Sequence, residues 1–187
     1  ERGEPLLQRV KRTTLAEPRC HLRDHGLPLR FADAPVEAAI RARLTAAFPQ
    51  HGLVGEEYGT QEGAHPVRWI IDPIDGTTNF IHAIPHFAIS IALEREGQLV
   101  SGLVFNPITD DMFVAEKGQG AYYNNRRMRV AARRTLSESM VACGVPPLAR
   151  VRDHESFKRE LSAAMAKIGN IRRLGAAALD LAAQLFG

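Results

Sequence analysis

The sequence has few of the features that mark secreted, redox-active or membrane proteins. Only two of its 187 residues are cysteines, Cys20 and Cys143, and they form no close metal or redox motif. This scarcity argues against a disulfide framework. No apolar run approaches the length of a membrane span, and the first residues lack the pattern of a secretory leader. We therefore expect a cytoplasmic protein with no membrane partner.

Excess charge is also small and is confined to one end of the chain. The formal net charge is +3, and residues 1–30, with seven Lys or Arg and four Asp or Glu, account for all of it. Because the rest is balanced, we do not expect a nucleic-acid partner. Residues 1–30 are interpreted as an atypical basic N-terminal arm, either solvated or a basic contact surface. The composition, 45% hydrophobic with ordinary Gly and Pro, fits one globular domain with a substantial core.

The most informative stretch covers residues 69–80, with the sequence Trp-Ile-Ile-Asp-Pro-Ile-Asp-Gly-Thr-Thr-Asn-Phe. Its first residues are typical of a buried strand. We expect the strand to stop at Asp72, because Pro73 has no N–H to donate to an interior ladder. Asp75 and Gly76 then supply turn chemistry. The two carboxylates should therefore leave the edge of a sheet close together.

Two carboxylates held this close repel each other, and a bound divalent cation would reverse that effect. Hard oxygen ligands of this kind suit Mg²⁺, and the turn would aim the carbonyl of Ile74 outward as a further ligand. The N–H groups and hydroxyls of Gly76, Thr77 and Thr78 could hold an anion. The stretch therefore indicates phosphoryl chemistry, although two aspartates at this spacing would, by themselves, fit a capped polar turn.

The string over residues 72–80 resembles the signature of the inositol monophosphatase family, whose members are Mg²⁺-dependent, lithium-sensitive phosphomonoesterases. A second family motif, Gly-Glu-Glu at residues 55–57, lies upstream in the expected order. The resemblance covers about residues 31–187. It implies an α/β fold of the layered α+β type, with mixed, largely antiparallel sheets between helix layers. Family members are commonly dimers, so it also allows a homodimer.

The resemblance implies a role for several residues. A first Mg²⁺ would lie on Glu56, Asp72 and the Ile74 carbonyl, and a second on Asp72 and Asp75, with a third, weaker ion held through water. Thr77, oriented by Asp33, would position or deprotonate the attacking water, and Glu57 would hold metal-bound waters. The residues implied in substrate binding are Asp75, Gly76, Thr77, Gly175 and Ala177.

Other segments serve as scaffold. Apolar residues at helical spacing predict a helix over residues 36–47, with Asp33 as its N-cap and Glu37 largely off the apolar face. Residues 58–66 are predicted as a loop, followed after the central string by an antiparallel meander. His82 and His86 have a metal-ligand spacing, but the proline between them and the absence of an acidic third ligand favour structural or surface roles.

The chain also departs from the family pattern. Only Asp33 is recognisable of an Asp-x-x-Thr-x-x-Asp-like segment, and Ala176 stands where the family usually has Ser or Thr. No Trp follows Trp69, so the family's Trp-Asp motif, whose Asp completes the second metal site, has no counterpart. We therefore expect residues 31–187 to be a domain truncated at its C-terminus, without the final layer and with weak or no activity of its own.

The favoured function is Mg²⁺-dependent hydrolysis of a phosphate monoester, with inositol 1-phosphate as the first candidate because Asn79 and Phe80 follow the threonine pair. A sister phosphatase acting on nucleotide 3′-phosphate, histidinol phosphate or sugar phosphate is one alternative. A non-catalytic, truncated or regulatory binding relative is another.

Overall fold

An eight-stranded sheet forms the centre of the structure, a computed structural model that describes residues 33–145 and 153–184. The strand order is β2-β1-β3-β4-β5-β6-β7-β8, and every neighbouring pair is antiparallel except β1 and β3, which are parallel. The strands are β1 (Gly52–Gly55), β2 (Gly59–Gln61), β3 (Val67–Asp75), β4 (Ala88–Arg95), β5 (Gln98–Asn106), β6 (Asp111–Glu116), β7 (Gly120–Tyr123) and β8 (Arg126–Arg127). This confirms the predicted mixed, largely antiparallel sheet.

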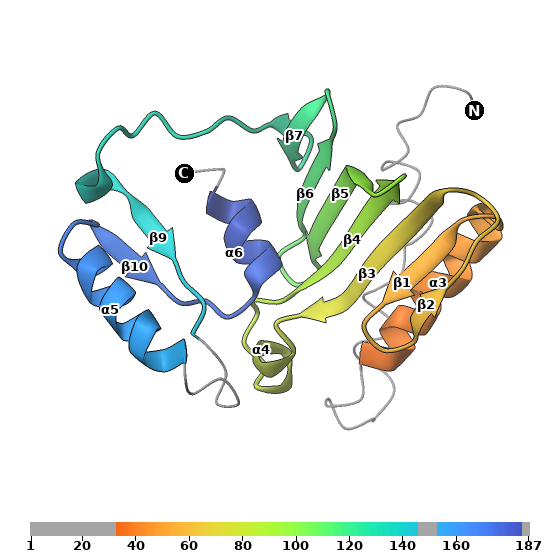
Figure 1. Cartoon of the computed structure of the whole chain (residues 1–187), viewed down its shortest axis with the longest axis horizontal. Coiled ribbons are helices and arrows are strands. Elements are labelled where there is room, and N and C mark those ends of the chain that lie inside the picture. The colour runs from red at the N-terminus through yellow and green to blue at the C-terminus, as the bar shows by residue number, and fades with distance from the viewer. Residues whose placement is uncertain (1–32, 146–152, 185–187) are drawn as a thin grey trace.

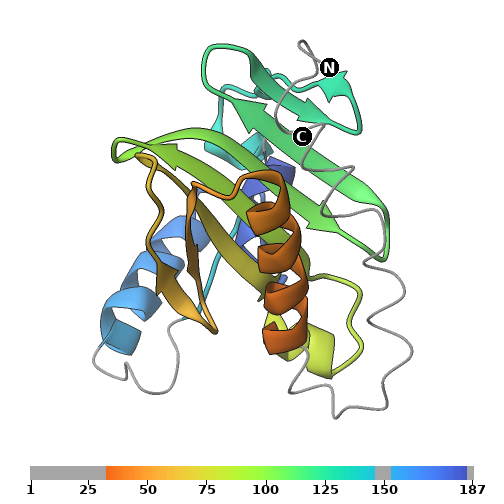
Figure 2. The ribbon, with the colours of Figure 1, turned by 90° about the vertical axis from the view of Figure 1, so that its right-hand side faces the viewer.

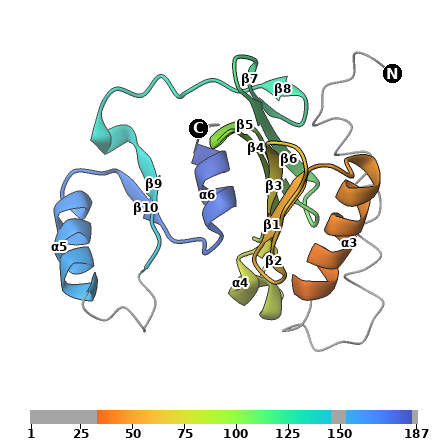
Figure 3. The same cartoon turned by 45° about the vertical axis from the view of Figure 1, so that its right-hand side comes forward.

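Helices lie on both faces of the sheet. Helix α3 (Asp33–Ala47) packs along β3 on one face, and α6 (Ala177–Gln184) lies against β4 and β5 on the other. Figure 3 shows the sheet nearly edge-on between the two, and Figure 2 shows α3 in front of the sheet. The short helix α4 (Thr77–Ile81) directly follows β3. The layered architecture that the sequence predicted is therefore confirmed.

A smaller sheet lies beyond α6, on the side away from α3 (Figure 1). It pairs β9 (Met140–Ala142) in parallel with β10 (Asn170–Arg172). A single turn of 3-10 helix, η2 (Leu136–Glu138), precedes β9, and α5 (Asp153–Met165) connects the two strands. Residues 173–176 then lead from this sheet into α6, which brings the C-terminal segment back to the end of β3.

Strand β3 continues further than the sequence predicted. It runs through Asp72 and Pro73 to Asp75, so the predicted end at Asp72 is wrong by three residues. The pairing with β4 shifts register between Asp72 and Asp75. Pro73 falls in this irregularity, where no ladder bond is required of its nitrogen. Asp72 and Asp75 therefore belong to the end of an interior strand, whose backbone pairing holds them more rigidly than a turn would.

Two further predictions fail on the α3 side of the sheet. Residues 59–61, expected to be part of a loop, form β2, an edge strand paired with β1. Glu37, expected to lie off the apolar face of its helix, is completely buried at 0% exposure. Periodicity detects apolar residues, so it gives no signal for a charged residue that is buried by a specific partner.

The main core lies between α3 and the sheet, and Trp69 is at its centre. Trp69 is 0% exposed, and its indole N–H donates to Nδ1 of His51 over 3.1 Å. Burial, together with His65 and Arg95, lowers the pKa of His51, which keeps this nitrogen able to accept. The buried residues of the cluster are Ile40, Leu44, Leu53, Val67, Trp69, Ile71, Ile89, Ile91, Leu93, Leu103, Phe105 and Met112.

The predicted arm of residues 1–30 lies outside the described residues. Of the helices in the two described ranges, none is both long enough and apolar enough to cross a membrane.

Replacing Trp69 by phenylalanine tests the place of this side chain in the core. The smaller ring leaves a cavity and removes the donor to His51, so we expect the free energy of unfolding to fall by about 1–3 kcal/mol. Urea denaturation followed by circular dichroism measures the change. Leu99→Ala is the control, since Leu99 is 62% exposed, and should change stability by less than about 0.5 kcal/mol. A Trp69→Phe effect as small as the control would contradict this view of the core.

Candidate active site

The predicted acidic residues converge where β3 ends and α3 begins. The charges of Asp75, Glu56 and Asp33 each raise the pKa of Asp72, and those of Glu57 and Glu56 raise the pKa of Asp33. Such effects require that the carboxylates lie near one another. The structure therefore brings together five of the predicted site residues, which are separated by up to 42 positions in the sequence (33 to 75).

Asp72 is the most strongly perturbed member on β3. Burial is the largest cause, followed by the charges of Asp75 and Glu56, and together they raise its pKa from 3.8 to about 6. Its Oδ1 atom is buried and has no hydrogen-bond partner. A buried polar atom without a partner is costly, and it calls for an explanation such as an ion or a functional role.

Asp33, on helix α3, likewise has a raised pKa and a buried oxygen without a hydrogen-bond partner. It is the first residue of α3, so the helix begins at Asp33 rather than after it as an N-cap would require. Burial first, and then the charges of Glu57 and Glu56, raise its pKa to about 6. Its Oδ1 is also buried and unpartnered. An oxygen of Asp33 is thus available to a ligand within the acidic group.

Asp75 has hydrogen bonds that join β3 to α6. Its Oδ1 accepts from the N–H of Ala177 at 3.2 Å, and its Oδ2 accepts from the N–H of Ala178 at 2.7 Å. A carboxylate at this position is favourable because the first N–H groups of a helix lack partners within the helix. The N–H of Ala177, predicted to contact substrate, is thus engaged by Asp75.

The link between β3 and α4 is tightly constrained. Gly76 has φ +89°, and a Cβ there would lie 2.9 Å from that of Ala176, so only glycine fits without strain. Thr77 donates its hydroxyl to the carbonyl of Ile74 at 3.1 Å. The implied orientation of Thr77 by Asp33 is therefore not the arrangement observed. The Ile74 carbonyl, which has two lone pairs, can accept this bond and still contact a ligand.

A polar clamp that the sequence reasoning missed holds α4 against the segment before α6. Asn79 is buried and donates through Nδ2 to the carbonyls of His86 and Leu174, both at 2.7 Å. The Nε2 atom of His86 contacts Oδ1 of Asp180 at 2.9 Å. Gly175 packs on this amide, since a Cβ there would lie 3.2 Å from Asn79. His86 therefore has the structural role predicted for it.

The donor set fits a hard divalent cation. Glu56, Asp72 and Asp75 offer carboxylates, Ile74 offers a carbonyl, and the mutual repulsion of the acids would be relieved by positive charge. Within residues 33–145 and 153–184, no three acidic, histidine or cysteine side chains are already grouped as a metal-binding cluster. The unpartnered Asp72 oxygen is nevertheless open to a cation, because Mg²⁺ usually takes only one or two carboxylates and completes its shell with water and phosphate.

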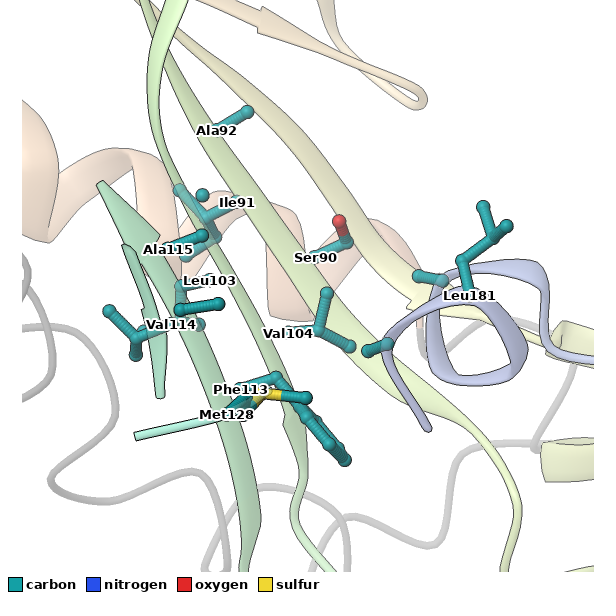
Figure 4. A pocket seen from close by; sticks show the side chains of 14 residues that line it. Ser90, Ile91, Ala92, Leu103, Val104, Phe113, Val114, Ala115, Met128 and Leu181 are labelled. Atoms are coloured by element: carbon teal, nitrogen blue, oxygen red, sulfur yellow. The ribbon is translucent and has the colours of Figure 1, made fainter. Parts of the chain in front are cut away.

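A cavity that the predicted site residues do not line lies between β4, β5, β6 and α6 (Figure 4). It has a volume of about 370 Å³, and apolar side chains such as Val104, Phe113 and Leu181 line it, with Ser90 as the polar exception. None of the predicted site residues lines it. The chemical groups of the site therefore lie at the end of β3, outside this cavity.

Known proteins are similar in sequence to this chain. The model of the Inositol monophosphatase family matches residues 22–185. Over 155 residues the chain is 51% identical to the inositol-1-monophosphatase of Rhizobium meliloti (strain 1021), in a match that covers 81% of this chain and 57% of that protein. The chain thus spans little more than half the length of this curated relative.

Solved structures share its fold. The extragenic suppressor protein suhB from Bartonella henselae superposes with a TM-score of 0.81 at 46% identity, covering 84% of this chain and 61% of that one. The inositol monophosphatase from Anabaena (Nostoc) sp. PCC 7120 gives 0.82 at 31% identity, covering 96% and 71%. Sequence and fold agree with the resemblance drawn from residues 55–57 and 72–80, and the chain belongs to the inositol monophosphatase family.

Proposed function

We propose that this protein is a Mg²⁺-dependent phosphatase of phosphate monoesters, with inositol 1-phosphate as the first substrate candidate. The observation that carries the proposal is the pair of buried, unpartnered oxygens on Asp33 and Asp72, which lie within one group of coupled acids. Such a group is unfavourable unless it serves a ligand. The curated relative named above is an inositol-1-monophosphatase, which supports this substrate class.

The metal would be held mainly by the end of β3. Glu56, Asp72 and the Ile74 carbonyl would hold one Mg²⁺, and Asp72 with Asp75 would take part in a second, with a third held through water. When bound, Mg²⁺ would offset negative charge on the phosphate and on the attacking water. Glu57 would hold metal-bound waters.

The chain's own groups would orient the reactants. Asp33 has an unpaired oxygen and a pKa of about 6, both suited to exchanging a proton with the attacking water near neutral pH. The hydroxyl of Thr77 would orient that water, and the N–H groups of Gly76 and Thr77 would hold the phosphate. Gly175 and Ala177 would lie beside the substrate's hydroxyl groups, with Ala177 acting alongside the Asp75 carboxylate that it binds.

Other parts of the proposal depend on the family resemblance. We include in the proposal lithium sensitivity, a homodimeric state and a cytoplasmic location. The sister phosphatase activities would be separated by a panel of inositol 1-phosphate, histidinol phosphate, nucleotide 3′-phosphate and sugar phosphates.

Asp72→Asn should make the metal-free protein more stable at neutral pH. Because folding raises the pKa of Asp72 from 3.8 to about 6, its contribution to stability is present below about pH 4 and is lost as pH rises through 6. In EDTA we expect the free energy of unfolding to decline less steeply in the variant between pH 4 and 7. The two slopes against pH should differ by up to the equivalent of about one bound proton.

Urea unfolding at several pH values, with the variant compared directly with wild type, measures this difference. Glu62→Gln removes an exposed acid on the loop after β2 and serves as the control. An Asp72→Asn profile parallel to wild type would show that Asp72 carries no such repulsion.

Phosphate release from inositol 1-phosphate tests the activity. We expect Mg²⁺-dependent turnover, since Glu56, Asp72, Asp75 and the Ile74 carbonyl would hold the metal beside the phosphate. Asp72→Asn should lower it roughly 10²–10³-fold, because it removes ~3–4 kcal/mol of transition-state stabilisation. Glu62→Gln should retain wild-type turnover. Release that persists in EDTA or in Asp72→Asn would contradict the proposal.

A further inference from the structure

Glu37 is a buried carboxylate for which the proposed reaction has no direct use. Burying a charge is costly unless it is paired and hydrogen-bonded, and Glu37 is 0% exposed. Its Oε1 accepts from Nε of Arg41 at 2.6 Å. It also accepts from two main-chain N–H groups, that of Glu57 at 2.7 Å to Oε2 and that of Tyr58 at 3.3 Å to Oε1. All of its partners thus belong either to its own helix or to the loop after β1.

That loop carries the acidic pair Glu56 and Glu57. It can lie on the carboxylate of Glu37 only because residue 55 is glycine, since a Cβ there would fall 1.9 Å from Oε1. Arg41 holds the far end of the loop, where its guanidinium donates to the carbonyl of Gly59. The loop is therefore fixed to α3 at both ends.

The three polar residues of α3 that face this region are spaced by four. Asp33, Glu37 and Arg41 lie on one face of the helix because residues four apart are stacked along it. Asp33 enters the acidic group directly, whereas Glu37 and Arg41 bind the loop that delivers Glu56. One rigid helix thus sets the positions of acids from two different parts of the chain.

We propose that Glu37 is a positioning residue: by binding the N–H groups of Glu57 and Tyr58, it fixes where the carboxylate of Glu56 stands relative to Asp72, and so sets the affinity for Mg²⁺. This inference rests on the proposed function. Mutating a residue that orients the ligands of a metal site typically weakens metal affinity about 10–100-fold.

The test separates positioning from a purely structural role. Glu37→Gln keeps the side-chain volume and one acceptor oxygen. It removes the negative charge and the second acceptor oxygen, which the N–H groups of the loop and Arg41 require. Calorimetric titration with Mg²⁺ should show affinity about 10–100-fold weaker than wild type. Amide hydrogen exchange in EDTA should show faster exchange at Glu57 and Tyr58. Glu62→Gln should leave both measurements unchanged.

A double-mutant cycle identifies the route of the effect. If Glu37 acts through Glu56, then Glu37→Gln should weaken Mg²⁺ binding little further once Glu56→Gln is present. Additive losses would overturn this route. If Glu37→Gln does not fold, Glu37→Asp keeps the charge but is one methylene too short to reach the loop, and it should show the same weakening.

The outcomes for this inference and for the proposed function are distinct. Wild-type affinity in a folded Glu37→Gln variant would overturn the role of Glu37 and leave the proposed function standing. A wild-type chain that binds no Mg²⁺ would overturn the proposed function, and this inference with it.

Discussion

The repulsion among acidic side chains at the end of β3 is the constraint on which the rest of the site depends. Asp33 and Asp72 are partly buried, close to other carboxylates, and each has an oxygen without a partner. A fold does not hold such a group together unless the surrounding elements are rigid. Here that rigidity comes from an interior strand, a helix packed on a buried tryptophan, and hydrogen bonds from Asp75 to the start of α6.

The acids in and around the site differ in how many hydrogen bonds their carboxylates accept. Glu37 is the most buried, yet it is satisfied by a guanidinium and two N–H groups. Asp75 is satisfied by two N–H groups of α6. Among the residues that the structure describes, Asp33 and Asp72 are the ones left with a buried, unpartnered oxygen. Glu37, which supports the site, is thus fully compensated, whereas Asp33 and Asp72 each keep an uncompensated oxygen that could meet a ligand.

Much of this arrangement could be predicted from the sequence, because motifs and apolar patterns encode it locally. The pattern of residues 69–80 located β3 and its carboxylates, and the alternating segments after it located the meander. The extension of β3 past Pro73 could not be predicted, since it depends on a register shift against β4. The burial of Glu37 and the clamp of Asn79 were missed for a related reason: both depend on partners distant in sequence or on main-chain groups, which leave no periodic signal.

The central claim is that Asp72 lies in a repulsive acidic group that a divalent cation would neutralise. Carbon-13 NMR of the Asp72 carboxyl, titrated against pH in EDTA and then in saturating Mg²⁺, measures this directly. The account predicts a pKa of about 6 without metal and a value below the ordinary 3.8 with it. A pKa near 3.8 in EDTA that Mg²⁺ leaves unchanged would contradict it.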